Sequence, residues 1–349
     1  MIVTKEMGTL LPHTTMSSPV YLDVKNAPFR LYGFDNGFCR VPNDVSKATS
    51  EVVERLARTS AGGRVRFRTN SDYIVVHGDF DYTENGTTWP IAAQAGFDIY
   101  FTENGKQKFR GVFGGSKPTG QNYSENRLRF TNEMKDVTIY FPVVTAFTNM
   151  YIGLHEGCVL EEMENYKYET PVVFYGSSIV HGVGAGRAST PYPSIISRRL
   201  DCNFRNLGFG GAAKAEKPIM EYIAGLDMSV FVYDYDHNAP TLEHLEKTHY
   251  AGYKLFREKQ PTTPVIMASR VDIDCGNVEE NEKCRALIKA NYERALAEGD
   301  ENVYFVDGAK VYPEDIRDEC TSDGCHPNDM GYSYMADAFG KIIKELIEK

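Results

Sequence analysis

Long apolar runs are missing from this sequence. No stretch approaches the roughly 18 consecutive apolar residues that a membrane helix needs, so we expect no membrane partner. The first residues, Met1–Met7, include an acidic side chain and lack the apolar core of a secretory signal. We therefore expect a cytoplasmic protein, and a signal removed from the chain is left open.

Paired cysteine motifs are also missing. The seven cysteines are an odd number and none forms a Cys-x-x-Cys pair, which fits a reduced compartment better than a disulfide framework. Cys320, Cys325 and His326 suggest a zinc site, and Asp234 with Asp236 suggests another metal. Neither set has the paired spacing of a structural zinc site, so we expect no metal.

Basic charge is in deficit. The chain has 38 Lys and Arg against 48 Asp and Glu, a formal net charge of −10. A nucleic-acid-binding protein needs a basic face to replace the counterions of phosphate, so this balance argues against one. The glycine-rich stretch Gly208–Gly211 lacks the spacing and the lysine of a P-loop and does not match Gly-x-Gly-x-x-Gly. We expect a small molecule as the partner and no cofactor.

What is present is an ordinary globular composition, 42% hydrophobic and 25% charged. A length of 349 residues favours two domains.

From about residue 20 to 155 the pattern is nearly all strand. Arg64–Thr69 alternates polar and apolar residues as a half-buried antiparallel strand does, and Asn104-Gly105 is a strong hairpin signal. Short strands with regular turns predict a β-sandwich or jelly roll.

The pattern changes near residues 161–166, an acidic stretch that we interpret as a linker. Beyond it, five apolar strands alternate with helical segments, which predicts a doubly wound parallel sheet. The expected strands are 171–175, 203–207, 228–234, 264–269 and 303–307, and the expected helices are 192–200, 242–259, 279–298 and 329–347. We place the β-domain at 1–165 and the α/β domain at 166–349.

Four turns of the α/β half carry residues suited to chemistry. They are Gly176–Ile179 after the first strand, Asn206–Gly211 after the second, Tyr235–Asn238 after the third, and Ser322–Pro327 before the last helix. Open α/β sheets bind ligands at the carboxyl ends of their strands, where these turns should meet.

These turns hold the parts that an activated serine requires. A serine hydroxyl is a weak nucleophile and needs a neighbouring base, and the base needs a group that fixes its tautomer. Asp323 and His326 could supply both from one loop. An oxyanion needs fixed donors, and the N–H groups of Ser178 and Gly211 and the side-chain amide of Asn238 are candidates.

The four turns resemble, in order, the motif blocks of the SGNH (GDSL-like) hydrolases. The resemblance covers about residues 171–349 and implies a flavodoxin-like three-layer α/β/α fold around a five-stranded sheet. It places the nucleophile at Ser178, oxyanion donors at Ser178, Gly211 and Asn238, and the base and acid at His326 and Asp323. Gly96–Tyr100 resembles the Gly-x-Asp-Leu-Tyr motif of a β-domain that is fused to such hydrolases. The combination is similar to two-domain carbohydrate acetyl esterases.

The sequence departs from this pattern at three points. Ser177 stands where the family usually has an aspartate, and Gly210 stands where it often has a serine. The third block lacks its leading glycine and trailing aspartate, which puts Asn238 in doubt. Ser178 by itself is equally a turn residue or a helix cap, and His237 and Ser177 are weaker candidates for substrate contact. His181 lies too close to Ser178 in the chain to be the better base.

The sequence therefore predicts a serine esterase that acts on a small acyl ester of a carbohydrate, with acetyl as the expected acyl group. Two alternatives stay open: a lipase or thioesterase acting on longer acyl chains, and a catalytically inactive glycan-binding protein. The sequence leaves a homo-oligomer open.

Overall fold

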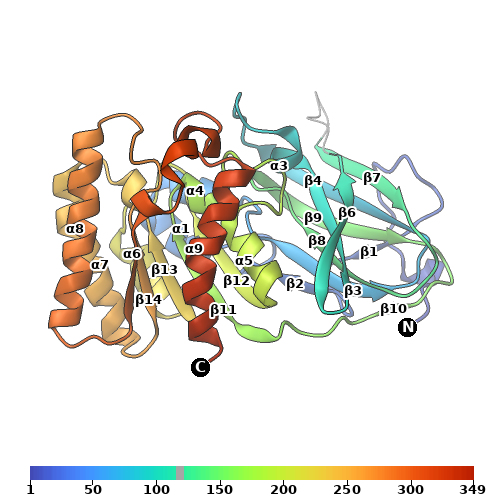
Figure 1. The fold of residues 1–349 in the computed structure, drawn as a ribbon. Coiled ribbons are helices and arrows are strands. Elements are labelled where there is room, and N and C mark those ends of the chain that lie inside the picture. Colours follow the sequence, from blue (N-terminus) through green and yellow to red (C-terminus); the bar gives the residue numbers. More distant parts are fainter. Residues whose placement is uncertain (115–121) are drawn as a thin grey trace. The chain divides into compact units, whose positions relative to one another are not determined.

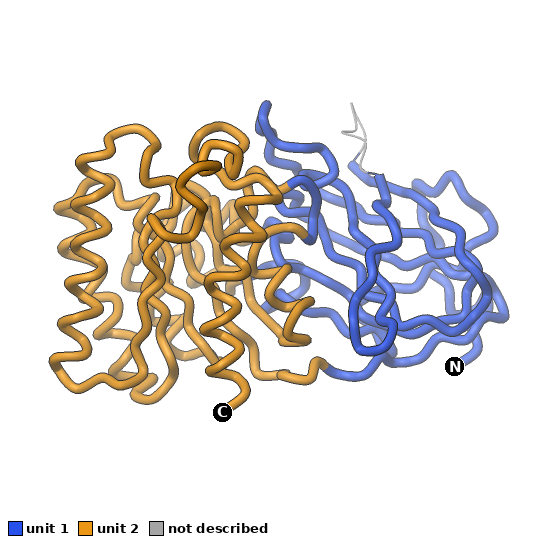
Figure 2. The backbone as a smooth tube through the Cα atoms, viewed as in Figure 1, with its two compact units in different colours: residues 1–40, 58–165, 186–189 blue, residues 41–57, 166–185, 190–349 orange. Residues whose placement is uncertain are grey.

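The computed structural model describes residues 1–114 and 122–349. It consists of two compact units (Figure 2). Unit 1 contains residues 1–40, 58–165 and 186–189, and unit 2 contains residues 41–57, 166–185 and 190–349. The chain thus changes unit after residue 165, and the short segments 41–57 and 186–189 belong to a different unit from their sequence neighbours. Within the described ranges, no helix is both long and apolar enough to cross a membrane.

Unit 1 contains two antiparallel sheets (Figure 1). The first has the order β1 (Val20–Asp23), β9 (Thr145–Leu154), β4 (Tyr73–Thr83), β7 (Tyr123–Arg129). The second has the order β10 (Leu160–Glu161), β3 (Arg64–Thr69), β8 (Lys135–Tyr140), β5 (Phe97–Glu103), β6 (Lys106–Phe113), and β2 (Arg30–Tyr32) also pairs with β3. Short helices η1 (Lys5–Met7) and α3 (Ile91–Ala95) complete the unit.

Alternating side chains from both sheets form one core. Val65 and Phe67 of β3 are buried in the same cluster as Ile74 and Val76 of β4. Successive side chains of a strand point to opposite faces, so each sheet contributes every second residue. This shared core confirms the predicted β-sandwich. The hairpin between β5 and β6 turns at Asn104-Gly105, where both residues have positive φ (50° and 71°), as the Asn-Gly signal predicts.

The Gly-x-Asp-Leu-Tyr-like motif lies on β5 and holds the segment 186–189. The buried Asp98 carboxylate accepts the Ser189 backbone N–H at 2.9 Å and Arg187 Nη1 at 3.0 Å. Arg187 Nη1 also donates to the Tyr100 hydroxyl at 2.8 Å. A buried carboxylate must be paired or hydrogen-bonded, and these bonds explain why residues 186–189 belong to unit 1.

Unit 2 is built on a five-stranded parallel sheet with the order β12 (Cys202–Gly208), β11 (Tyr168–Gly176), β13 (Val230–Asp234), β14 (Val265–Ala268), β15 (Val303–Val306). Numbered along the chain from β11, this order is 2-1-3-4-5, the flavodoxin-like arrangement. It confirms the predicted fold class.

Helices cover both faces of this sheet (Figure 1). Its α-helices are α1 (Asn43–Thr49), α2 (Glu51–Ala57), α4 (Ser178–His181), α5 (Tyr192–Leu200), α6 (Lys217–Ala224), α7 (Leu242–Lys259), α8 (Val278–Ala297) and α9 (Asp329–Ile347). Its 3₁₀ turns are η2 (Asp236–Asn238), η3 (Gly308–Lys310) and η4 (Glu314–Cys320). Phe174 of β11 packs on Tyr192 of α5, whereas its neighbours Val173 and Tyr175 join the core under α6 and α7. Consecutive apolar residues in β11 are therefore buried on opposite faces.

Residues 41–57, which the sequence analysis placed in the β-domain, form α1 and α2 and pack in unit 2. Val53 and Leu56 are buried in one cluster with Ala212 and Ile219. Their partners lie more than 150 positions away in the chain, and local periodicity carries no information about contacts at that separation.

Candidate active site

The candidate site lies at the carboxyl end of the unit 2 sheet. The chain leaves β11 toward β12 on one side and returns to β13 on the other, so the strand order reverses between β11 and β13. Such a reversal leaves a crevice where open α/β sheets bind ligands. The turns after β11, β12 and β13 all reach this edge, as the sequence predicts.

The turn after β11 presents Ser178. At Gly176 an added Cβ would lie 1.9 Å from the Asp234 carbonyl oxygen, so only glycine fits. Ser177 is fully buried and caps α4, its hydroxyl accepting the Ile179 backbone N–H at 3.2 Å. Ser178 is the first residue of α4, and a helix leaves the N–H of its first residue without an intrahelical partner. The two serines thus have different positions, one inside the turn and one at its tip.

Ser178, His326 and Asp323 form a continuous hydrogen-bonded chain. Ser178 Oγ lies 3.0 Å from His326 Nε2, and His326 Nδ1 lies 2.8 Å from Asp323 Oδ2. His326 and Asp323 are about a quarter exposed. Asp323 is therefore placed to fix the histidine tautomer that leaves Nε2 free to accept the serine proton.

The loop itself holds Asp323 in place. Asp323 Oδ1 accepts the backbone N–H groups of Cys325 at 3.1 Å and His326 at 2.8 Å. Burial opposes the charged carboxylate, but these N–H groups and the His326 side chain outweigh it and lower the pKa of Asp323. Just beyond, Asn328 caps α9 and donates to the carbonyls of Glu319 and Thr321. One short loop thus fixes both Asp323 and His326.

The turn after β12 packs directly against α4. Asn206 donates to the Val180 carbonyl at 2.7 Å and accepts the Gly208 N–H at 2.9 Å. A Cβ at Gly208 would lie 2.1 Å from the His181 backbone nitrogen. Gly211 has φ +73°, and no non-neighbouring atom lies within 4 Å of the position its Cβ would take. The site therefore has open space beside Gly211.

Asn238 ends the 3₁₀ turn η2 that follows β13. Its Oδ1 accepts the Ala213 backbone N–H at 3.3 Å. The amide oxygen is thus engaged, which turns the Nδ2 donor away from Ala213. A neutral amide held at one end is a suitable hydrogen-bond donor for developing negative charge.

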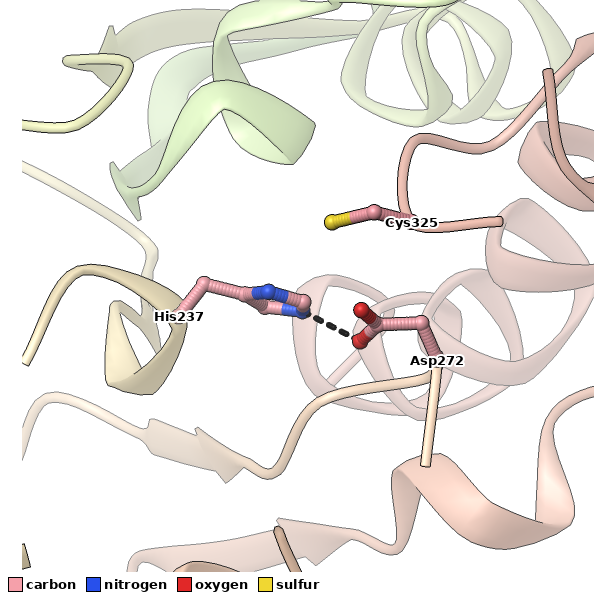
Figure 3. Close-up of side chains that lie close together, drawn as sticks. All are labelled: His237, Asp272 and Cys325. Carbon is pink, nitrogen blue, oxygen red and sulfur yellow. Dashed lines mark ion pairs between the residues drawn. The ribbon is translucent and has the colours of Figure 1, made fainter. Parts of the chain in front are cut away.

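The structure also brings in two residues that sequence reasoning missed, Asp272 and Arg270 in the turn after β14. Asp272 is fully buried and lies 2.8 Å from His237 Nε2. Arg270 Nη2 and Nε bond its two oxygens at 2.7 and 3.0 Å. Figure 3 shows His237 and Asp272 facing each other, with Cys325 beside them. Their position in the sequence could have pointed to them, because this turn follows a fourth parallel strand of the same sheet.

The remaining sequence candidates are placed as follows. His237 is 6% exposed and paired with Asp272. His181 is buried at the end of α4. Cys320 is buried and its thiol lies 3.5 Å from the Ile316 carbonyl oxygen. The contacts of substrate with Ser177 and His237 stay predictions.

Two family models match the chain. A model described as GDSL-like lipase/acylhydrolase family matches residues 169–344, and one described as the N-terminus of SGNH-hydrolase-type esterases, GxDLY, matches residues 20–160. No protein among those with curated descriptions matches significantly.

Several solved structures have a similar fold. A protein assigned as a GDSL-like lipase from Bacteroides ovatus is 27% identical, with a TM-score of 0.84 over 94% of this chain and 98% of that one. A salicylyl-acyltransferase from a tetracycline biosynthetic pathway is 18% identical, with a TM-score of 0.73 over 91% and 95%. A family two carbohydrate esterase from Clostridium thermocellum is 14% identical, with a TM-score of 0.58 over 82% and 92%.

Proposed function

Because the chain belongs to the GDSL-like lipase/acylhydrolase family, we propose that it is a serine esterase whose catalytic residues are Ser178, His326 and Asp323. The observation that carries this proposal is the unbroken chain of contacts from Ser178 Oγ through His326 to Asp323, at 3.0 and 2.8 Å. It has the nucleophile–base–orienting acid arrangement that activates a serine hydroxyl.

In the proposed reaction, His326 Nε2 takes the proton of Ser178 as Oγ attacks the ester carbonyl carbon. His326 then gives that proton to the leaving alcohol oxygen as the carbon–oxygen bond breaks, which leaves an acyl-enzyme on Ser178. Water attacks the acyl-enzyme with His326 again as the base, and the acid product leaves. Asp323 holds the Nδ1 proton of His326 and offsets the positive charge of the imidazolium throughout.

Three donors would stabilise the oxyanion that forms in both steps: the N–H groups of Ser178 and Gly211 and Asn238 Nδ2. The Ser178 amide is at the start of α4, the space beside Gly211 is open, and the Ala213–Asn238 bond engages the other end of the amide. Each such donor typically contributes about 2.7–4 kcal/mol to transition-state stabilisation.

Acetyl esters of carbohydrates are the substrates we propose. Proteins of the same fold include family two carbohydrate esterases and an acetyl xylan esterase from Butyrivibrio proteoclasticus. Those likenesses, at 14% and 12% identity, concern the fold. A screen of acetylated oligosaccharides with released acetate as the readout identifies the sugar.

The catalytic assignment is tested with p-nitrophenyl esters of increasing chain length. We expect the wild type to hydrolyse the acetate and Ser178→Ala to lose at least 10³-fold in kcat, on the order of what removal of a triad member costs. Ser177→Ala is the matched control, and we expect it still to form the acyl-enzyme in a burst experiment. Undiminished turnover by Ser178→Ala would contradict the assignment. A steep preference for long chains would favour the lipase alternative, and an inactive wild type would favour the glycan-binding one.

A further inference from the structure

A cluster of three side chains of metal-binding types, His237, Asp272 and Cys325, lies beside the candidate active site but outside its hydrogen-bonded chain. His237 comes from η2, Asp272 from the turn after β14, and Cys325 from the loop before α9. One ligand atom of each lies within 4.8 Å of the other two. Figure 3 shows all three pointing into the same space. Residues so distant in the chain converge because all three turns lie at one edge of the sheet.

The contact between His237 and Asp272 is close but does not have hydrogen-bond geometry. Nε2 and Oδ1 are 2.8 Å apart, yet the buried Nε2 has no hydrogen-bond partner among the described residues. The carboxylate oxygen therefore lies away from the direction in which the ring nitrogen bonds. Two ligands of one tetrahedral ion, each about 2.1 Å from the metal, are about 3.4 Å apart and are aimed at the ion rather than at each other, so an entering ion would separate this pair by about half an ångström.

Burial makes this arrangement costly unless it is compensated. The His237 side chain is 6% exposed and Asp272 is fully buried. Asp236, adjacent to His237, is buried as well, and its Oδ1 has no partner in the described structure. The Arg270 guanidinium donates to both oxygens of Asp272, and the Arg270 backbone N–H donates to Asp236 Oδ2. In metal sites, residues that hydrogen-bond a ligating carboxylate hold it in the orientation that binding requires, and Arg270 could hold Asp272 in this way.

Of the three residues, Asp272 lines a pocket, whereas His237 and Cys325 are not among the residues that line it. Asp272 lines a pocket of about 450 Å³, and Asp323, Cys275 and Asp274 line it too. The pocket is acidic, which favours the entry of a cation.

From this geometry we propose that His237, Asp272 and Cys325 bind a thiophilic divalent cation of the zinc class. Imidazole, carboxylate and thiolate together suit Zn²⁺ and Co²⁺ rather than the oxygen-seeking Mg²⁺ or Ca²⁺. Three protein ligands leave one position for water. On binding, the Cys325 thiol releases its proton to solvent and the sulfur–metal bond replaces the sulfur–hydrogen bond, with no change of oxidation state.

The ion would also stabilise the loop that carries Asp323 and His326. The Cys325 backbone N–H donates to Asp323 Oδ1. A metal ion that holds the Cys325 side chain would therefore also restrain the Asp323 carboxylate. Metal binding is therefore expected to raise the unfolding temperature of the protein, by mass action on the folded state. This consequence does not depend on whether the protein hydrolyses esters.

Cobalt titration of the full chain tests the proposal. We expect Co²⁺ to give a thiolate-to-cobalt charge-transfer absorption that Zn²⁺ abolishes by competition. Cys325→Ser should lose this band, and His237→Gln should bind Co²⁺ at least tenfold more weakly. Cys275→Ser is the matched control, because Cys275 lines the same pocket without belonging to the cluster, and it should keep the band.

Folding is checked separately by circular dichroism, and Cys325→His guards against a variant that merely unfolds. It should still bind Co²⁺, with the visible bands of a nitrogen-rich site and without the thiolate band. Absence of the band in wild type, or its persistence in Cys325→Ser, would overturn the proposal. Because the readout is absorbance, failure here leaves the esterase proposal standing, and the reverse also holds.

Discussion

At the scale of single residues, the two adjacent serines show how one backbone turn separates a buried capping position from one whose hydroxyl reaches a histidine. Ser177 caps α4 from inside the turn, and Ser178 reaches His326 from its tip. The family resemblance predicts Ser178 rather than Ser177 as the nucleophile, and we propose the same choice because Ser177 is fully buried. Ser177 also answers part of the question raised by the missing aspartate, since a hydroxyl caps a helix as well as a carboxylate does.

Asp323 offers the sharpest test of a single residue. Asp323→Asn keeps an oxygen for the backbone N–H groups of Cys325 and His326 but removes the charge that orients the imidazole. We expect kcat for p-nitrophenyl acetate to fall on the order of 10³- to 10⁴-fold with little change in KM. Asp315→Asn, at an exposed position of η4, should be neutral. A kcat within tenfold of wild type would show that His326 is oriented by something else.

At the scale of elements, local pattern predicted α5, α7 and α9 with the bounds that the structure has, Tyr192–Leu200, Leu242–Lys259 and Asp329–Ile347. Each has a recognisable start and a clear apolar face. Residues 41–57 are a different case. The sequence analysis places them in the β-domain, whereas they form α1 and α2, and Val53 and Leu56 are buried in the core of unit 2. Sequence analysis does not single out Asp272 and Arg270, because only their position after a fourth parallel strand relates that turn to His237.

The packing of β12 against α4 gives an element-scale prediction. Gly208→Ala would place a Cβ 2.1 Å from the His181 nitrogen and 2.7 Å from the Val180 carbonyl carbon. Both atoms are backbone, so α4 or the end of β12 must move. We expect a loss of unfolding free energy of about 1–3 kcal/mol or more, measured by denaturant titration. Labelling of Ser178 by a fluorophosphonate should slow as α4 shifts.

Gly340→Ala in α9 is the matched control for that substitution. Its Cβ would meet Ile196 Cγ1 at 3.5 Å, an ordinary contact. Alanine is favoured over glycine inside a helix by about 1 kcal/mol, so this variant should be as stable as wild type or more so, with unchanged labelling. Equal stability of both variants would mean that the close approach at Gly208 is relieved without cost.

At the scale of the whole molecule, the two units carry different spectroscopic signals. The chain has a single tryptophan, Trp89, in unit 1, where its ring packs on Gly86. In the described part of the chain, every helix longer than five residues lies in unit 2. All of them are α-helices except the 3₁₀ helix η4. Tryptophan fluorescence therefore follows the unfolding of unit 1, and the helical circular dichroism signal follows unit 2. The two signals can be compared without separating the units.

This division allows a pH-dependence to be assigned to unit 2. His249 of α7 is buried against Tyr233 and Tyr235, and its Nδ1 lies 3.1 Å from Asn291 Nδ2. Burial lowers the pKa of His249 to about 3, against 6.5 for the unperturbed side chain. Between those values the unfolded chain takes up a proton that the folded chain does not, so the stabilisation is complete above pH 6.5 and is lost as the pH falls toward 3.

From pH 7.5 to pH 5.0, the uptake of that proton should cost the folded state about 2 kcal/mol. His249→Gln removes the titrating group, so the variant should lose less stability than wild type over this interval, whatever its stability at pH 7.5. His155→Gln, at an exposed position of unit 1, serves as the control. The difference should appear in the urea midpoint followed by helical circular dichroism and leave the Trp89 transition unchanged. An equal pH-dependence in wild type and His249→Gln would show that His249 is protonated in the folded protein.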